Sequence, residues 1–251
     1  MPTLIAHPTG NYRFLPGIAP YSCGVVADPG FEVVHVALQQ PRDWFDGFEF
    51  VERFLQRQAR PRAALCAMEL RSPSPFTMQG FIEFNREYCA VLESWGVFVE
   101  GQNPIARTNV APVGWNSNAP QLVGFSFVRP NPELARPTWI VAGAGELREG
   151  TLVDDGIIRR GETSGDAIFE KARYVVQVMC ARLAGLGGSW SEVSRVSAYT
   201  IHSLDRVLAE LLLGEMPAVA RSGVRWLYSR PPVIDIEFEM DLQGVVTEWL
   251  V

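Results

Sequence analysis

The chain has 251 residues, with 22 basic and 28 acidic side chains and a formal net charge of −6. Hydrophobic residues make up 47% and charged residues 20% of the sequence, a composition that is ordinary for a globular protein with a sizeable core and that excludes a disordered chain. The basic residues are scattered rather than gathered into a stripe, which argues against nucleic acid or an anionic membrane as partner. The length fits one large domain or two smaller ones.

Metal-ligand and redox motifs are missing from the sequence. The cysteines and histidines stand singly at Cys23, Cys66, Cys89, Cys180, His7, His35 and His202. Without C-x-x-C or paired-histidine spacing, we interpret the cysteines as reduced core residues and expect no metal and no cofactor. The first residues lack a basic region followed by a long apolar core, and no apolar run reaches membrane-spanning length, so a cytoplasmic location is expected.

In the first half of the chain, side-chain periodicity predicts strands and two helices. The strands are expected at 21–27, 31–38, 63–70 and 105–110, and the helices at 46–58 and 77–96. Because Asp28-Pro29-Gly30 is a strong turn signal, the first two strands are expected to form a hairpin. Thr77 is placed to cap the start of the second helix.

The second half continues with the same kinds of pattern. Strands are expected at 138–144, 151–159 and 193–200, and helices at 164–185, begun by Ser164 or Asp166, and at 204–213. Arg221 then opens a strand, and a Ser-Arg-Pro-Pro turn at 229–232 leads into a second strand that ends at Glu239. This final hairpin would bring a guanidinium group and carboxylates together.

The two halves repeat the order strand, strand, helix, strand, helix, strand. The segment Ile105-Ala106-Arg107-Thr108-Asn109-Val110 also corresponds to Val219-Ala220-Arg221-Ser222-Gly223-Val224. Such pairing indicates a duplicated domain. We divide the chain into domains 1–120 and 121–251, with the proline-rich segment 129–137 as a connection or insertion; the strand 122–128 could end the first domain or begin the second.

Arg221 and Glu237 are the polar residues with the clearest chemical potential. A guanidinium group is a permanently charged fork that grips a carboxylate, so Arg221 is a candidate anchor for a small anion, with a salt bridge as the alternative. Alternation along the last strand would place Asp235, Glu237 and Glu239 on one face. A carboxylate of this set in a cleft could position or deprotonate water; the alternative is a solvated strand face.

These residues resemble a known family. Ala220-Arg221-Ser222-Gly223-Val224, a proline ten residues after the arginine, and Ile236-Glu237-Phe238-Glu239 resemble the end of the Rid (YjgF-type) superfamily of enamine/imine deaminases. Pro20-Tyr21-Ser22-Cys23-Gly24-Val25 resembles its opening, and Asn85 followed by Tyr88 resembles its second helix. The motifs are individually loose, but their shared order spans most of both halves.

The resemblance implies an α+β fold of two tandem Rid-like (chorismate-mutase-like) domains, each a mostly antiparallel sheet with two helices on one face. In the family an arginine binds the substrate carboxylate and a glutamate handles the hydrolytic water, in clefts between subunits. Carried over by position, Arg221 would be the anchor and Glu237 the catalytic carboxylate. Arg107, Tyr21 and Asn85 would be the corresponding substrate-binding positions of the first repeat.

The departures from the family pattern suggest that the repeats share one site. The first repeat has no glutamate near Gly124, and the second has no tyrosine near its start. We therefore hypothesise one composite cleft in which Tyr21 or Asn85 complements Arg221 and Glu237. Two repeats do not complete a three-fold ring of sites, so a homo-oligomer is compatible with the sequence.

The resemblance favours a cofactor-independent deaminase that hydrolyses a small, anionic 2-amino enoate or imino acid to a keto acid and ammonia. One alternative is a chorismatase-like enzyme acting on a cyclic dicarboxylate, because that group also joins a Rid-like half to a degenerate half. The other is a non-catalytic regulatory module that binds small carboxylates. A nuclease is the least favoured function, given the acidic balance and the lack of metal ligands.

Overall fold

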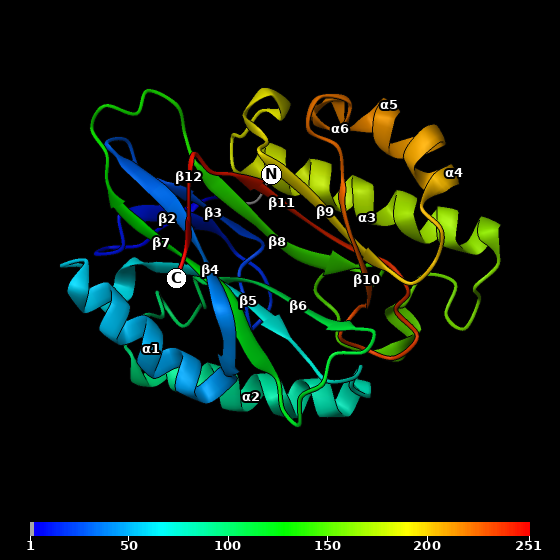
Figure 1. Ribbon diagram of the computed structural model, residues 1–251, viewed down its shortest axis with the longest axis horizontal. Helices are drawn as coiled ribbons and strands as arrows, with labels where there is room; N and C mark the ends of the chain where they lie inside the picture. Colours follow the sequence, from blue (N-terminus) through cyan, green and yellow to red (C-terminus); the bar gives the residue numbers. More distant parts are fainter. Residues whose placement is uncertain (1–2) are drawn as a thin grey trace.

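Residues 3–251, which the computed structural model describes, form an α+β fold whose strands lie between helices on opposite sides of the molecule (Figure 1). One mixed sheet of twelve strands runs through these residues, in the order β1-β2-β3-β8-β11-β9-β10-β6-β5-β7-β4-β12. The strands are β1 (Ile5–Ala6), β2 (Tyr12–Leu15), β3 (Gly24–Ala27), β4 (Phe31–Asp43), β5 (Leu65–Arg71), β6 (Ala106–Pro112), β7 (Gln121–Pro130), β8 (Trp139–Gly145), β9 (Arg195–Thr200), β10 (Arg225–Arg230), β11 (Glu239–Gly244) and β12 (Thr247–Leu250).

The long helices are amphipathic and begin at capping residues. They are α1 (Trp44–Arg57), α2 (Met78–Ser94) and α3 (Gly165–Gly185). Thr77 caps α2 through its side-chain oxygen, as the sequence predicts, and of the two predicted starts of α3, Ser164 and Asp166, Ser164 is the cap. The shorter segments are α4 (Asp205–Val207), a π-helical turn at Leu208–Leu212, α5 (Leu213–Glu215), α6 (Pro217–Ser222) and 3-10 turns at Arg62–Ala64, Asp154–Gly156 and Trp190–Glu192. No helix among residues 3–251 is both long enough and apolar enough to cross a membrane.

The sheet has two halves with the same strand order and the same directions. In the first, β4 pairs antiparallel with β7, β7 antiparallel with β5, and β5 parallel with β6. In the second, β8, β11, β9 and β10 pair in the same three senses. Helices α1 and α2 cover the outer face of the first half, and α3 covers that of the second (Figure 1).

Strict alternation of side chains separates an apolar outer face from a polar inner one. In β11, Met240 and Leu242 join the apolar cluster under α3, whereas Asp241 and Gln243 point to the other half. In β5, Met68 and Leu70 pack under α1 and α2, whereas Glu69 points inward. The period of two along each strand thus places polar groups between the halves.

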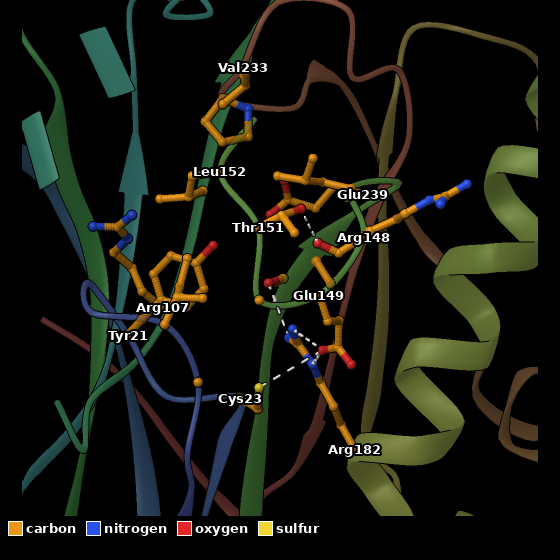
Figure 2. Close-up of a pocket in the computed structure, with 18 of the residues that line it drawn as sticks. Tyr21, Cys23, Arg107, Arg148, Glu149, Thr151, Leu152, Arg182, Val233 and Glu239 are labelled. Carbon is orange, nitrogen blue, oxygen red and sulfur yellow. Dashed lines mark hydrogen bonds and ion pairs between the residues drawn. The ribbon is translucent and has the colours of Figure 1, made fainter. Parts of the chain in front are cut away.

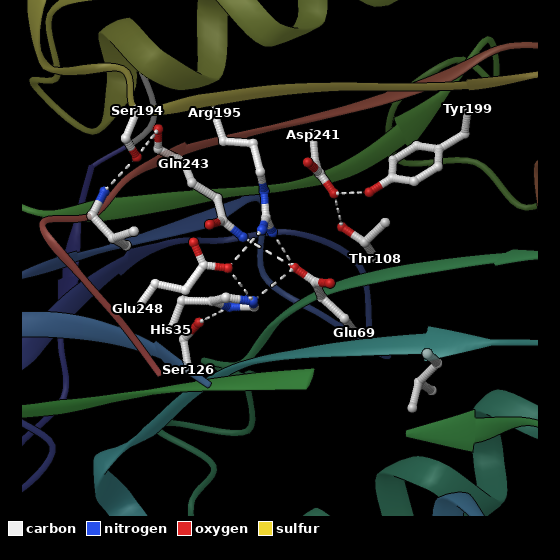
Figure 3. A network of polar contacts seen from close by, with 12 residues as sticks. His35, Glu69, Thr108, Ser126, Ser194, Arg195, Tyr199, Asp241, Gln243 and Glu248 are labelled. Carbon is white, nitrogen blue, oxygen red and sulfur yellow. Dashed lines mark hydrogen bonds and ion pairs between the residues drawn. The ribbon is translucent and has the colours of Figure 1, made fainter. Parts of the chain in front are cut away.

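These inward groups form a polar network between the two halves (Figure 3). Glu69 Oε1 accepts hydrogen bonds from Arg195 Nη2 at 2.5 Å and from Gln243 Nε2 at 3.0 Å, and it lies 3.8 Å from His35 Nε2. Burial alone would raise the pKa of Glu69, but the positive charges of Arg195, His35 and Arg71 outweigh it and lower the pKa to about 2. The halves are therefore joined through an ionised, paired carboxylate.

Two predicted hairpins are wrong. The Asp28-Pro29-Gly30 turn forms, with the Phe31 amide bonded to the Asp28 carbonyl, but the strands it joins separate. β3 pairs with β2 and β8, while β4 pairs with β7 and β12. The C-terminal hairpin is absent as well, because β10 runs parallel to β9 and antiparallel to β6, whereas β11 pairs with β8 and β9.

Further expectations fail in loops and at strand ends. The segment 151–159 is a loop with a 3-10 turn rather than a strand, and residues 217–222 are helical, with Pro217 at the first helical position. The last carboxylate-bearing strand starts only at Glu239, so Asp235 and Glu237 lie outside it; Asp235 has a positive φ of 72° in the preceding turn. The strands β1, β2 and β12 are not predicted from the sequence.

The pairing of the chain ends bears on the predicted division at residue 120. β7 pairs with β4 and β5, so a boundary at 120/121 separates this strand from its partners in the first half. β3 connects the N-terminal strands to β8, and β12 returns from the C-terminus to β4. Each end of the chain therefore adds strands to the half that is distant in sequence.

Candidate active site

A cavity of about 310 Å³ lies between the two halves (Figure 2). Its wall is drawn from the loop after β2, the inner face of β6, the end of β8, the loop that follows β8, helix α3 and the segment that leads into β11. Its polar and charged side chains come from Tyr21, Cys23, Arg107, Asn109, Arg148, Glu149, Thr151, Arg182 and Glu239. Leu147, Leu152, Val233 and Ile236 supply apolar surface.

Arg107, on β6, is held in an aromatic setting. Its guanidinium carbon lies 4.9 Å from the ring centre of Tyr21 and 4.7 Å from that of Tyr88, distances at which a cation is attracted to a ring face. Its Nη2 donates to Asn85 Oδ1 at 2.7 Å. Within residues 3–251, Arg107 Nη1 and Asn85 Nδ2 are buried without a hydrogen-bond partner. Unpaired buried donors are costly, so an anion in this position would complete the site.

Glu239 faces the cavity from the first position of β11 and is 5% exposed. Burial raises the pKa of its carboxyl group well above the ordinary value, and the negative charge of Asp241 raises it further, against the opposing charge of Arg107. A Cβ atom added at Gly143, across the cavity wall, would overlap the Glu239 carboxyl group, so glycine at 143 makes the space for it. The site thus holds a carboxyl group whose burial favours the protonated form, which can act as a proton donor.

Arg182, on α3, forms a second charged group in the wall. Its Nη1 donates to the Ala142 carbonyl at 3.0 Å, while Nε and Nη2 donate to Oε1 of Glu149 at 3.0 and 2.8 Å. Desolvation raises the pKa of the nearby Cys23 thiol, although the charge of Arg182 opposes this rise. Cys23 is therefore a thiol rather than a thiolate at neutral pH.

Tyr21 lies within the electrostatic influence of both arginines. Desolvation raises the pKa of its phenol, and the charges of Arg107 and Arg182 both oppose that rise. Figure 2 shows Arg107 and Arg182 on opposite sides of the cavity, with Tyr21 beside Arg107. The phenol is protonated at neutral pH and can donate a hydrogen bond to a bound ligand.

The structure brings some of the predicted site residues together and separates others. Arg107 and Tyr21 line the cavity, and Asn85 binds Arg107 from behind. Glu237 lies next to the cavity but outside its wall, and its Oε2 is bonded to His202 Nε2 at 2.9 Å and to Arg230 Nη1 at 3.3 Å.

Arg221 lies elsewhere. It is exposed on α6, where its guanidinium group donates to the carbonyls of Ser191 and Val193. The predicted pairing of Arg221 with Glu237 across a hairpin is wrong, because that hairpin does not form.

Among the cavity residues that the sequence does not assign to the site, Glu239 and Arg182 each leave a signal. Glu239 stands in the motif Ile236-Glu237-Phe238-Glu239, two positions from the predicted glutamate. Arg182 is a charged residue on the buried face of α3, beside Val178 and Met179. A charge on an otherwise apolar helix face indicates a buried partner or a ligand. Within residues 3–251, no group of three or more histidine, cysteine, aspartate or glutamate side chains is placed to hold a metal ion.

Comparisons with known proteins identify close relatives. A family model described as 2-aminomuconate deaminase CnbZ matches residues 4–249. A 2-amino-5-chloromuconate deaminase from Comamonas testosteroni is 37% identical over 255 residues, covering 99% of this chain and 99% of the relative.

Among solved structures the likeness is lower. A chorismatase crystal structure has a TM-score of 0.43 at 12% identity, covering 89% of this chain and 77% of the other. A cyanuric acid hydrolase from A. caulinodans has a TM-score of 0.40 at 13% identity, covering 87% and 68%. These scores are too low to carry an argument.

Proposed function

The chain belongs to the CnbZ family of 2-aminomuconate deaminases, and we propose that its reaction takes place in the cavity between Arg107 and Glu239. The reaction is the hydrolytic deamination of a 2-amino enoate, in which water replaces the amino group and a keto acid and ammonia are formed. Family membership favours this activity over a chorismatase-like reaction and over a module that binds carboxylates without turnover.

Arg107 binds the carboxylate next to the amino-bearing carbon. The observation that carries this assignment is the buried Nη1, which has no hydrogen-bond partner within residues 3–251. Asn85 fixes the other side of the guanidinium group, and the Tyr21 and Tyr88 rings hold its plane. Because the guanidinium group is already oriented, it can bind a carboxylate without a change in its own position. The bound carboxylate then fixes the position of the neighbouring, reacting carbon.

Glu239 moves the protons of the reaction. Its carboxyl group donates a proton to the enamine carbon, the C=C bond moves to C=N, and a protonated imine forms beside the Glu239 carboxylate. That carboxylate then takes a proton from water as the water oxygen bonds to the imine carbon. This restores the carboxyl group and gives a neutral carbinolamine.

Ammonia leaves in a second exchange at the same residue. The Glu239 carboxyl group gives its proton to the carbinolamine nitrogen, the C–N bond breaks, and the carbinolamine hydroxyl returns a proton to Glu239 as the C=O bond forms. The net change is one enamine and one water converted to one keto acid and one ammonia. Glu239 ends in the protonated state in which it began, the state that its burial favours.

We further propose that the two halves are Rid-like repeats that share this one site. The identical order and directions of β4-β7-β5-β6 and β8-β11-β9-β10 support a duplication. The composite cleft proposed here contains other residues than the one inferred from the sequence, because Arg221 and Glu237 do not take part. The first repeat supplies Arg107, Tyr21 and Asn85, and the second supplies Glu239.

Activity measurements on two variants test the proposal. Arg107→Gln removes the carboxylate anchor and is expected to lower kcat/KM for 2-aminomuconate about a hundredfold, which corresponds to the loss of a charge-assisted hydrogen bond. Arg57→Gln, on the exposed side of α1, is the matched control and is expected to keep the wild-type rate. Release of ammonia by Arg107→Gln at the wild-type rate would show that the reaction occurs elsewhere.

A further inference from the structure

We propose that Arg182 binds the second carboxylate of a dicarboxylate substrate, and that Glu149 occupies this position in the free enzyme. The inference rests on the proposed function, because it assigns the two ends of the same cavity. It deepens that function by naming the residue that selects a dicarboxylate over a monocarboxylate.

Arg182 is built into the cavity wall rather than into the protein surface. Its side chain is 9% exposed, and its Nη1 is fixed by the carbonyls of Ala142 and Gly143 at 3.0 and 3.4 Å. These carbonyls belong to β8, so the guanidinium group is oriented by the sheet itself. The remaining nitrogens, Nε and Nη2, form a side of the guanidinium group that is suited to binding a carboxylate.

In the free enzyme the Glu149 carboxylate lies at those two nitrogens, and a ligand carboxylate could displace it. Glu149 is on the loop between β8 and α3, and its side chain is 47% exposed. It receives both hydrogen bonds on a single oxygen, Oε1, so the stronger fork in which each nitrogen binds its own oxygen is not formed. Gly150 follows it directly, with a φ of 78°, a backbone conformation that other residues rarely adopt. The contact resembles a stand-in for an anionic ligand.

The cavity has the layout that a linear dicarboxylate requires. 2-Aminomuconate carries a carboxylate at each end of a six-carbon diene. Arg107 and Arg182 lie on opposite sides of the cavity (Figure 2). Leu147, Leu152 and Ile236 supply apolar surface in its wall.

The two ends of the cavity are not equivalent. The charge of Arg107 acts on Glu239, whereas Arg182 is not among the main influences on that carboxyl group. The amino-bearing carbon therefore lies at the Arg107 end, and the distant carboxylate replaces Glu149 on Arg182.

Binding of two unreactive ligands separates this role from a structural one. Muconate has the carbon chain of the substrate and both carboxylates, whereas 2,4-hexadienoate has a methyl group in place of one of them. Calorimetric titration is expected to show Glu149→Gln binding muconate about fivefold more tightly than the wild-type enzyme, because the competing charge of a partly exposed ion pair is removed. Binding of 2,4-hexadienoate is expected to stay unchanged. Glu133→Gln, which removes an exposed charge in the segment before β8, is the control and should change neither value.

The outcomes discriminate clearly. Muconate affinity that is unchanged or weakened in Glu149→Gln, or an equal change for both ligands, would overturn the assignment of Arg182. The same titrations with Arg107→Gln keep the two proposals apart. If Arg107→Gln weakens both ligands while Glu149→Gln has no selective effect, the cavity is the site but Arg182 is not the second anchor. If Arg107→Gln leaves both affinities intact, the location of the active site itself is wrong.

Discussion

Glu239 and Asp241 project from the same face of β11, and the negative charge of Asp241 helps to raise the pKa of Glu239. Asp241 Oδ2 accepts hydrogen bonds from Tyr199 Oη at 2.7 Å and from Thr108 Oγ1 at 2.9 Å, so its position is fixed by both halves of the sheet. The pKa of Glu239, which moves protons in the proposed reaction, is thus raised by Asp241, a neighbour that does not line the cavity.

Asp241→Asn is expected to shift the pH dependence of the reaction. Asparagine keeps an acceptor for Tyr199 and Thr108 but removes the negative charge, so the pKa of Glu239 falls. Because the first step needs protonated Glu239, the alkaline limb of the kcat/KM profile should move to lower pH, by about one unit. Asp235→Asn, in the turn before β11, is the control. An alkaline limb that does not move in Asp241→Asn would contradict this coupling.

Glu239→Gln and Glu237→Gln should behave very differently. The first removes the proton donor and acceptor, and we expect kcat to fall about a thousandfold with KM changed only a few-fold. The second affects a carboxylate bonded to His202 and Arg230 outside the cavity wall, and we expect kcat to stay within about fivefold of the wild type. Steady-state rates of 2-aminomuconate consumption measure both. The opposite ranking would restore Glu237 as the catalytic carboxylate.

Arg221→Gln distinguishes the position inferred from the family motif from the one that the fold supports. Its guanidinium group binds only backbone carbonyls near α6 among residues 3–251, apart from the neighbouring Ser222 hydroxyl. We expect kcat/KM for 2-aminomuconate to remain near the wild-type value, while the free energy of unfolding drops by about 1 kcal/mol. Urea denaturation and the activity assay together measure this. A large loss of kcat/KM in a stably folded Arg221→Gln protein would refute the cavity assignment.

Glu69→Gln should weaken the contact between the two halves in a pH-dependent way. The pKa of Glu69 is lowered from an ordinary 4.5 to about 2 in the folded protein. A lowered pKa stabilises the fold fully above about 4.5, and this contribution is lost as the pH falls towards 2.

At pH 7 we therefore expect Glu69→Gln to lower the free energy of unfolding by about 3 kcal/mol, with the difference from wild type shrinking below pH 4.5. Denaturant titrations across this range measure it. Glu49→Gln, which breaks an exposed pair with Arg53, should cost less than about 0.5 kcal/mol at any of these pH values. A Glu69→Gln difference that is independent of pH would contradict the pairing.

Local patterns predict the helices well and the strand partners poorly. The helical spacing and the caps Thr77 and Ser164 lie within a few residues of the element they define, so α2 and α3 follow from the sequence. The Asp28-Pro29-Gly30 turn also forms as predicted. However, a turn does not determine whether its flanking strands pair, because β3 and β4 find partners that are distant in sequence.

In the candidate site, too, the structure brings some of the residues named from the sequence together and separates others. Arg107 contacts both Tyr21 and Asn85, the three residues that the sequence resemblance groups in the first half of the chain. The positions inferred for the second half are misleading because Pro217 begins a helix where the sequence pattern predicts a strand. The last inner strand, in addition, begins at Glu239 rather than ending there. An alternation pattern does not determine where a strand begins, yet the position of the start decides which carboxylate reaches the cavity.

The crossed pairing of the two chain ends has a consequence for dividing the protein. A cut in the segment between β7 and β8 leaves an N-terminal piece that carries β3, the neighbour of β8, and a C-terminal piece that carries β12, the neighbour of β4. Each piece exposes an edge that only the other can cover. The two pieces are thus natural candidates for fragment complementation, with catalytic activity appearing only on reassembly because Arg107 and Glu239 are on different pieces.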